Sequence, residues 1–229
     1  RVQPNWAVTF LPSGITPSDA LVIFALSDYA SFAMLQSRVH GIWANFLSSS
    51  MKDDLRYSVS DCFESYPFPI NYKKVIGLND RGREYFNFRA EVMVAQEQGL
   101  TKTYNRFHDP HEQSEGILEL RRLHGLMDGA VLRAYGWDDL ADKATCEFLL
   151  DYEEEENDDP RATKSKKKKP WRYRWPDEFR DEVLARLLEL NEQRHKEEVA
   201  KGLVNADGSK PKTISKNKSK RKDQDGQKK

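Results

Sequence analysis

Apolar residues recur at spacings of three and four near the start of the chain, at Phe32, Leu35, Val39, Ile42 and Phe46. That spacing places them on one face of an α-helix. Ser27 and Asp28 stand just before this stretch and are residue types that cap a helix N-terminus. The sequence therefore predicts one helix whose apolar face packs against a partner.

Two polar stretches, residues 48–69 and 99–110, are rich in groups that can donate hydrogen bonds to phosphate. The candidate DNA-binding residues are Lys52, Arg56, Tyr57 and Ser58 in the first stretch and Lys102, Thr103, Tyr104, Asn105 and Arg106 in the second. Two alternatives stay open. Both stretches could be solvated surface loops, or Arg56 and Arg106 could pair with nearby carboxylates such as Asp54 and Asp109 and staple the loops.

The rest of the chain predicts an α+β fold that is mostly helical. Short apolar runs between prolines and glycines predict two strands, residues 6–10 and 21–26, as the end of a sheet. Further helices are predicted over about residues 80–98, from a cap at Ser114 to Gly136, and from Pro176 to Gly202. His124 falls on an apolar helix face, where a satisfied core histidine is the expected role.

Charge is unevenly distributed, although 37 basic and 37 acidic residues give a net charge of +0. Residues 151–159 hold seven acids, and residues 161–169 hold six bases. Strand-like stretches on either side, residues 146–152 and 171–175, predict a β-hairpin. Its tip, residues 153–169, is predicted to be a disordered charged loop, because nothing there can bury apolar surface. Residues 203–229 are predicted to be a disordered basic tail.

Several kinds of site have no support in the sequence. Cys62 and Cys146 lack metal-binding spacing, so we expect reduced thiols in a cytoplasmic protein and no zinc site. His108 and His111 flank Asp109, but two histidines in a proline-containing loop are weak support for a metal. The chain contains no nucleophile elbow, P-loop or dinucleotide-binding glycine pattern. It contains no apolar run of the roughly 20 residues that a membrane span needs. We therefore expect no catalytic, cofactor-binding or metal-binding residue here, and no membrane contact.

Four motifs occur in the order LQSRVHGIWA, SSSMKDDLRYSVSDCFESYPFP, GLTKTYNRFHDP and LRRLHGLMDGAVLRAYGW. In that order they resemble the C-terminal region of large bacterial adenine-specific DNA methyltransferases of the MmeI-like type. These enzymes belong to type IIG restriction-modification or phage-defence systems. The resemblance covers roughly residues 2–202. It implies that residues 1–70 are the C-terminal part of a target-recognition domain and that residues 71–202 are a helical extension.

The resemblance also implies what a longer parent protein would do. The parent would bind S-adenosylmethionine and hold a flipped adenine for methylation at N6, because chemistry on a base requires taking it out of the stack. Those functions would lie in an upstream methyltransferase domain, since neither Asn-Pro-Pro-Tyr nor a glycine-rich cofactor loop occurs here. This segment would bind double-stranded DNA. The alternative is a non-catalytic protein-interaction module that docks a partner subunit.

Overall fold

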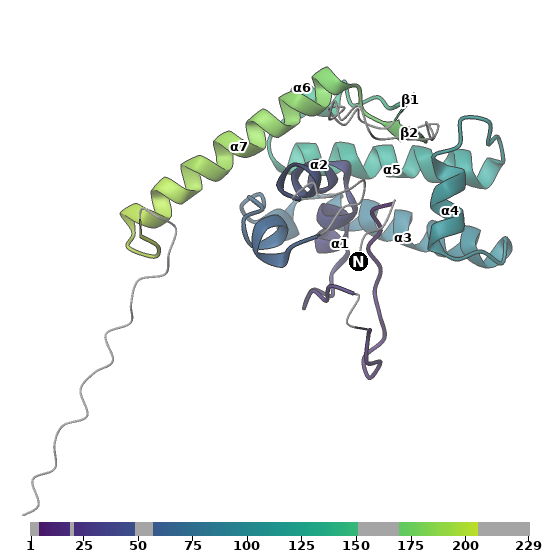
Figure 1. Cartoon of the computed structure of the whole chain (residues 1–229), viewed down its shortest axis with the longest axis horizontal. Coiled ribbons are helices and arrows are strands. Elements are labelled where there is room, and N and C mark those ends of the chain that lie inside the picture. Colours follow the sequence, from purple (N-terminus) through teal and green to yellow (C-terminus); the bar gives the residue numbers. More distant parts are fainter. Residues whose placement is uncertain (1–4, 19–20, 49–56, 151–169, 206–229) are drawn as a thin grey trace, which may run out of the picture. The chain divides into compact units, whose positions relative to one another are not determined.

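The computed structural model describes residues 5–18, 21–48, 57–150 and 170–205 (Figure 1). Residues 1–191 form one compact unit, and residues 192–229 form a second. The described residues are mostly helical and contain one two-stranded antiparallel sheet. The predicted fold class is confirmed.

The elements follow one another as α1 (Tyr29–Gln36), α2 (Arg38–Leu47), the π-helical turn η1 (Val59–Glu64), the 3-10 turn η2 (Tyr72–Lys74), α3 (Leu78–Ala95), α4 (Leu100–Phe107), α5 (Glu115–Ala134), α6 (Asp138–Ala141), β1 (Glu147–Leu150), β2 (Trp171–Arg174) and α7 (Asp177–Ala200).

The helix predicted from Phe32 to Phe46 is two helices, because Ser37 interrupts it. Ser37 is extended, with φ −63° and ψ 156°; its N–H closes α1 on the carbonyl of Ala33. Its side chain then accepts the N–H of His40 and caps α2. Asp28 caps α1 as predicted, accepting the N–H of Ser31 at 2.8 Å. The break leaves Ala30 to Gln36 buried on almost every side.

The core of the first unit forms where α1 and α5 pack against α3 (Figure 1). Fully buried side chains include Phe32, Tyr85, Ile117 and Met127. Gly82 permits the close approach of α3 to α1, since a Cβ at Gly82 would collide with the backbone carbonyl of Tyr29. The predicted recognition part (residues 1–70) and helical extension (residues 71–202) therefore share one core, because α1 and α2 pack with the later helices.

Two further sequence predictions differ from the structure. Residues 6–12 and 22–27 belong to no strand, so the two predicted strands are absent from the described residues. Strand propensity supplies no partner, and side chains bond the main chain of the first segment instead, as at Val8. Part of the predicted polar loop, residues 99–110, is the helix α4. Thr103, Tyr104 and Phe107 are buried on one narrow face of α4. The polar residues around them in the sequence hide the spacing that would have predicted this helix.

The helices predicted near residues 80–98, 114–136 and 176–202 are confirmed as α3, α5 and α7. Gly136 and Gly202 follow α5 and α7 with φ of +77° and +67°, the left-handed conformation that favours glycine. The predicted hairpin is also confirmed, with Glu147 opposite Arg174 and Leu150 opposite Trp171. The predicted charged loop (153–169) lies outside the described residues, as does the predicted tail from residue 206 onward.

The first turns of α7 belong to the first unit, where Val183 and Leu187 are buried. Asn191 donates to the carbonyl of Ser65 at 2.6 Å. Within the second unit, Lys196 and Glu192 form an ion pair at 2.7 Å. Among the described helices, none is long and apolar enough to cross a membrane.

Candidate nucleic-acid interface

The two polar stretches meet at two adjacent residues, Asn5 and Trp6. Asn5 Nδ2 donates to Asn105 Oδ1 at 3.1 Å, which ties it to α4 and the second stretch. The Trp6 ring lies 4.9 Å from the ring of Tyr57, which opens the described part of the first stretch. Residues that are far apart in sequence are therefore brought to one place by the N-terminal segment, residues 5–12.

The first predicted set is only partly placed. Lys52 and Arg56 lie outside the described residues. Tyr57 is half-buried, and its hydroxyl lies 3.0 Å from Nε2 of His40. Ser58 accepts the N–H of Asp61 at 3.4 Å and caps η1. In this structure Tyr57 contacts His40 on α2, and Ser58 caps η1 within the same polar stretch.

His40 supports Tyr57 from inside the core. It is fully buried between the rings of Trp6 and Tyr66, at 5.3 and 4.5 Å. Burial lowers the pKa of His40 to about 3, so the ring is neutral at physiological pH. Among the described residues, its Nδ1 has no hydrogen-bond partner. The neutral ring supports the Tyr57 hydroxyl without placing a charge beneath it.

The second predicted set lies on α4, and the helix divides it between two faces. Thr103 is 1% exposed, and its hydroxyl donates to the carbonyl of Gly99 at 3.2 Å. Tyr104 is 3% exposed, and its hydroxyl lies 2.8 Å from the hydroxyl of Tyr85. Burial leaves Thr103 and Tyr104 no surface for a phosphate. Lys102 and Asn105 lie on the exposed face, so the candidate DNA contacts of α4 narrow to these two side chains.

Arg106 acts as a staple, which was the structural alternative for this residue. Its Nε donates to Glu112 Oε2 at 2.7 Å and its Nη2 to Ser114 Oγ at 2.9 Å. Its Nη1 reaches the side-chain oxygens of Gln96 and Gln98, at 3.3 and 3.4 Å. The hydrogen bond from Arg106 lowers the pKa of Glu112 to about 2. The partner is Glu112, not the Asp109 suggested by proximity in sequence.

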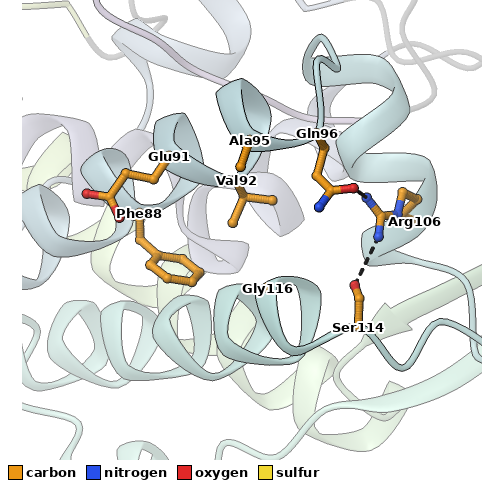
Figure 2. Close-up of a pocket in the computed structure, with 8 residues that line it drawn as sticks. All are labelled: Phe88, Glu91, Val92, Ala95, Gln96, Arg106, Ser114 and Gly116. Carbon is orange, nitrogen blue, oxygen red and sulfur yellow. Dashed lines mark hydrogen bonds between the residues drawn. The ribbon is translucent and has the colours of Figure 1, made fainter.

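A pocket of about 240 Å³ lies beside this staple, between the end of α3 and the start of α5 (Figure 2). Phe88, Val92, Ala95 and Gly116 make its lining largely apolar. Figure 2 shows the Arg106 guanidinium at one end, turned toward Gln96 and Ser114. Because each nitrogen of Arg106 already donates a hydrogen bond, the pocket presents no free cation to an anionic ligand.

Arg172 joins the interface, although no sequence pattern identified it. It lies on β2, and its Nη1 donates to Asn5 Oδ1 at 3.4 Å. Asn5 thereby bridges α4 and β2, accepting from Arg172 and donating to Asn105. One sequence feature that could have indicated Arg172 is its alternation with Arg174 along a predicted hairpin strand, because it puts a basic side chain at every second residue.

A buried ionic cluster lies elsewhere in the core. Arg38 Nη1 lies 2.5 Å from Asp128 Oδ2 and 2.7 Å from His124 Nδ1, and the Arg38 N–H donates to Asp128 Oδ1 at 2.9 Å. His124 Nδ1 is also 3.0 Å from Asp128 Oδ2. Burial lowers the pKa of His124, more strongly than Asp128 raises it. His124 is therefore a satisfied core histidine, as predicted.

The described residues give no support for a metal site. No group of three or more histidine, cysteine, aspartate or glutamate residues among them could hold a metal ion. His108 Nδ1 accepts the N–H of Tyr173 at 3.0 Å, which ties it to β2. Cys62 is buried and Cys146 partly buried; both are free thiols, and burial raises the pKa of Cys146 to about 11. Neither thiol is activated as a nucleophile.

Comparison with known proteins finds a similarity that covers the first part of this candidate interface. Residues 4–70 match the family model of the MmeI target recognition domain. The predicted resemblance to MmeI-like recognition regions is confirmed. A DNA methyltransferase A of Bacillus subtilis (strain 168) is 27% identical over 134 residues, which cover 55% of this chain and 14% of that protein. The chain thus spans a small part of that relative's length. No solved structure gives a significant match.

The matched region contains Asn5, Trp6, Tyr57 and Ser58 but ends before α3. Lys102 and Asn105 on α4 and Arg172 on β2 lie beyond it. The surface around Asn5 and Trp6 therefore combines the segment that matches the recognition-domain model with side chains from the following helical region.

Proposed function

We propose that this chain is a C-terminal DNA-recognition and support segment of a site-specific DNA methyltransferase. Double-stranded DNA is its proposed partner, and the surface around Asn5 and Trp6 is the proposed contact. The observation that carries the proposal is the match of residues 4–70 to the MmeI target recognition domain. In this proposal residues 1–70 end the recognition domain, and residues 71–202 form the helical extension that supports it.

The chemistry of this surface supports the proposal. Exposed lysine and amide side chains, such as Lys102 and Asn105, make the phosphate contacts that give sequence-independent affinity. Lys52 and Arg56, which lie outside the described residues, are proposed as further phosphate contacts by their chemistry alone. The Asn5 side chain is held by hydrogen bonds to Asn105 and Arg172, which keeps the polar groups in a defined arrangement.

The activity we propose for the parent protein follows from the resemblance and from the methyltransferase relative. An upstream methyltransferase domain would bind S-adenosylmethionine and transfer its methyl group to adenine N6 within a recognised site. Such an enzyme would serve restriction-modification or phage defence in the bacterial cytoplasm, where its DNA substrate lies. In this proposal the present segment holds no catalytic residue and no cofactor of its own.

Salt dependence of duplex binding tests the proposal. Lys52→Ala combined with Arg56→Ala, and separately Lys102→Ala, should weaken binding to duplex DNA. Each lost phosphate contact should flatten the plot of log affinity against log salt by about one unit. Lys143→Ala is the matched control. Lys143 is also exposed, but it lies outside both polar stretches, in the connection between α6 and β1. Slopes that match the control for all variants would contradict DNA contact by these residues.

A protein-interaction module is the second candidate, and one observation favours it. Leu21, Val22 and Ile23 are 49%, 38% and 58% exposed in a segment outside any described sheet. Consecutive exposed apolar residues are typical of a surface that another protein covers. Under this alternative, Ile23→Ser would abolish binding to a partner subunit while duplex affinity and its salt slope stayed unchanged. A loss of duplex affinity on Lys102→Ala would instead favour the recognition role.

A further inference from the structure

Both main-chain hydrogen-bonding groups of Val8 are held by side chains. Gln36 Oε1, at the end of α1, accepts the Val8 N–H at 2.8 Å. Arg89 Nη2, on α3, donates to the Val8 carbonyl at 2.7 Å. These are the two groups that a neighbouring strand would bond in an antiparallel ladder. Two side chains thus take the place of a strand at one residue of the N-terminal segment.

Arg89 is built into the core for this contact. It is 2% exposed, and its Nη1 donates to Gln36 Oε1 at 3.1 Å and to the Tyr104 hydroxyl at 3.0 Å. Its Cζ lies 5.4 Å from the centroid of the Phe32 ring and 5.7 Å from that of Tyr85. Among the described residues, no carboxylate pairs with it. The guanidinium is stabilised by rings and neutral acceptors, one of which is the Val8 carbonyl.

Burying an arginine in this way is costly for stability alone. The cost of removing a charge from water can exceed what its partners return, so stability gives little reason to place arginine here. What an apolar residue cannot do is bond one particular carbonyl. A segment without strand partners could slip along the helices by two residues and keep its side chains on the same faces. The hydrogen bonds from Gln36 and Arg89 act against such a slip.

The consequence appears at the residues that precede Val8. With Val8 held, Trp6 Nε1 donates to the Leu35 carbonyl at 2.6 Å and its ring meets Tyr57. Asn5 then reaches Asn105 and Arg172. A displaced segment would remove the link between the two polar stretches.

We propose that Gln36 and Arg89 are positioning residues for DNA recognition. They set the register of the N-terminal segment, which places the first polar stretch against α4 and β2 as one surface. The inference rests on the proposed function, and it adds two buried residues that touch no DNA themselves. Two groups held in a fixed relation bind a rigid duplex together more tightly than two groups that move independently.

The first readout needs no DNA. Gln36→Met is close in volume to glutamine and removes the acceptor, so the Val8 amide should exchange its hydrogen with solvent at least about tenfold faster. Gln36→Glu keeps an acceptor and should restore most of the protection. Arg81→Met, at an exposed position of the same helix as Arg89, is the control and should leave Val8 unchanged. Unchanged protection in Gln36→Met would overturn the inference.

The second readout is duplex binding at a temperature where every variant is folded. Gln36→Met should weaken binding to duplex DNA about tenfold at low salt and flatten the salt slope, with Gln36→Glu close to wild type. Arg89→Met should act in the same direction where it folds. Wild-type affinity and slope in a folded Gln36→Met variant would overturn the positioning role and leave the proposed function standing. A wild-type chain that binds no duplex would instead contradict the proposed function.

Discussion

The N-terminal segment and the helical body of the first unit hold their main chains in different ways. In α3 and α5, main-chain groups bond within each helix, and apolar side chains fill the space between the helices. The N-terminal segment has no strand or helix: side chains of α1 and α3 bond its main chain at Val8, and its own Trp6 side chain donates to the Leu35 carbonyl. The segment therefore depends on the helical body for its position, whereas the helical body does not depend on the segment to the same degree.

Because of this difference, the stability of the fold and the position of the N-terminal segment depend on different interactions. Stability arises from close packing and a few satisfied polar clusters in the helical body. The position of the N-terminal segment arises from directed hydrogen bonds donated or accepted by buried polar side chains. Substitutions in the body should therefore change the free energy of unfolding, and substitutions at the contacts of the segment should change DNA binding more than stability.

The largest loss of stability is expected from Asp128→Ala in the helical body. Asp128 is fully buried and accepts from both the backbone and the side chain of Arg38. Its removal leaves the buried Arg38 charge unpaired, which should lower the free energy of unfolding by about 3–5 kcal/mol in urea titrations. Asp142→Ala breaks an exposed pair with Arg133 and should cost less than about 1 kcal/mol. Equal losses in the two variants would contradict the role assigned to the buried cluster.

Acid should destabilise the body over a defined pH range. Burial lowers the pKa of His40, His108 and His124 below the ordinary value of 6.5. The unfolded chain then binds more protons than the folded chain, so stability is present above pH 6.5 and is lost as pH falls below it. The free energy of unfolding in urea titrations should fall between pH 6.5 and 5.5 by about 1 kcal/mol from His40 alone, and His108 and His124 should add to this loss. A flat profile over that range would show that these histidines are protonated in the folded state.

Gly82→Ala tests the contact between α1 and α3. A methyl group there meets the Tyr29 carbonyl, so the two helices must separate, at a cost of about 2 kcal/mol. Gly125→Ala on α5 is the matched control, because its Cβ would meet nothing within 4 Å. Alanine has the higher helix propensity, so this control should gain about 0.5–1 kcal/mol. Thermal unfolding distinguishes the two, and a stabilised Gly82→Ala variant would contradict the close approach.

The smallest effect is expected at the Arg106 staple. Arg106→Gln removes a partly exposed ion pair with Glu112 and should lower the free energy of unfolding by about 1 kcal/mol or less. Its salt slope for duplex binding should stay at the wild-type value, because the guanidinium is occupied within the chain. Lys102→Ala, one turn earlier on α4, should flatten that slope without changing stability. A flattened salt slope for Arg106→Gln together with an unchanged slope for Lys102→Ala would contradict both assigned roles.

The helical body was more predictable from sequence than the segment. Apolar periodicity and caps such as Ser114 identify α3, α5 and α7, because a helix face and its ends are local properties. The break between α1 and α2 was missed, since Ser37 sits within an unbroken apolar period. The strands predicted at residues 6–10 and 21–26 followed β propensity, but a strand exists only with a partner that propensity does not supply.

For the candidate site, the sequence analysis mixed residues that face inward with residues that face outward. Tyr104 and Lys102 are equally suited to phosphate by chemistry, and only the packing of α4 separates them. Arg106 looked like a phosphate ligand because its partner Glu112 lies beyond the expected neighbours. Gln36 and Arg89 could not be found, because their roles depend on contacts between residues far apart in the chain.

The most direct test is the footprint of a duplex on the chain, measured by hydrogen exchange with and without double-stranded DNA at low salt. DNA recognition by the surface around Asn5 and Trp6 predicts slower exchange in the N-terminal segment, at residues 57–58 and along the exposed face of α4. Hydrogen exchange in the pocket beside Arg106 and in α7 should be unchanged. Protection confined to those two regions, with none around Asn5 and Trp6, would contradict the account.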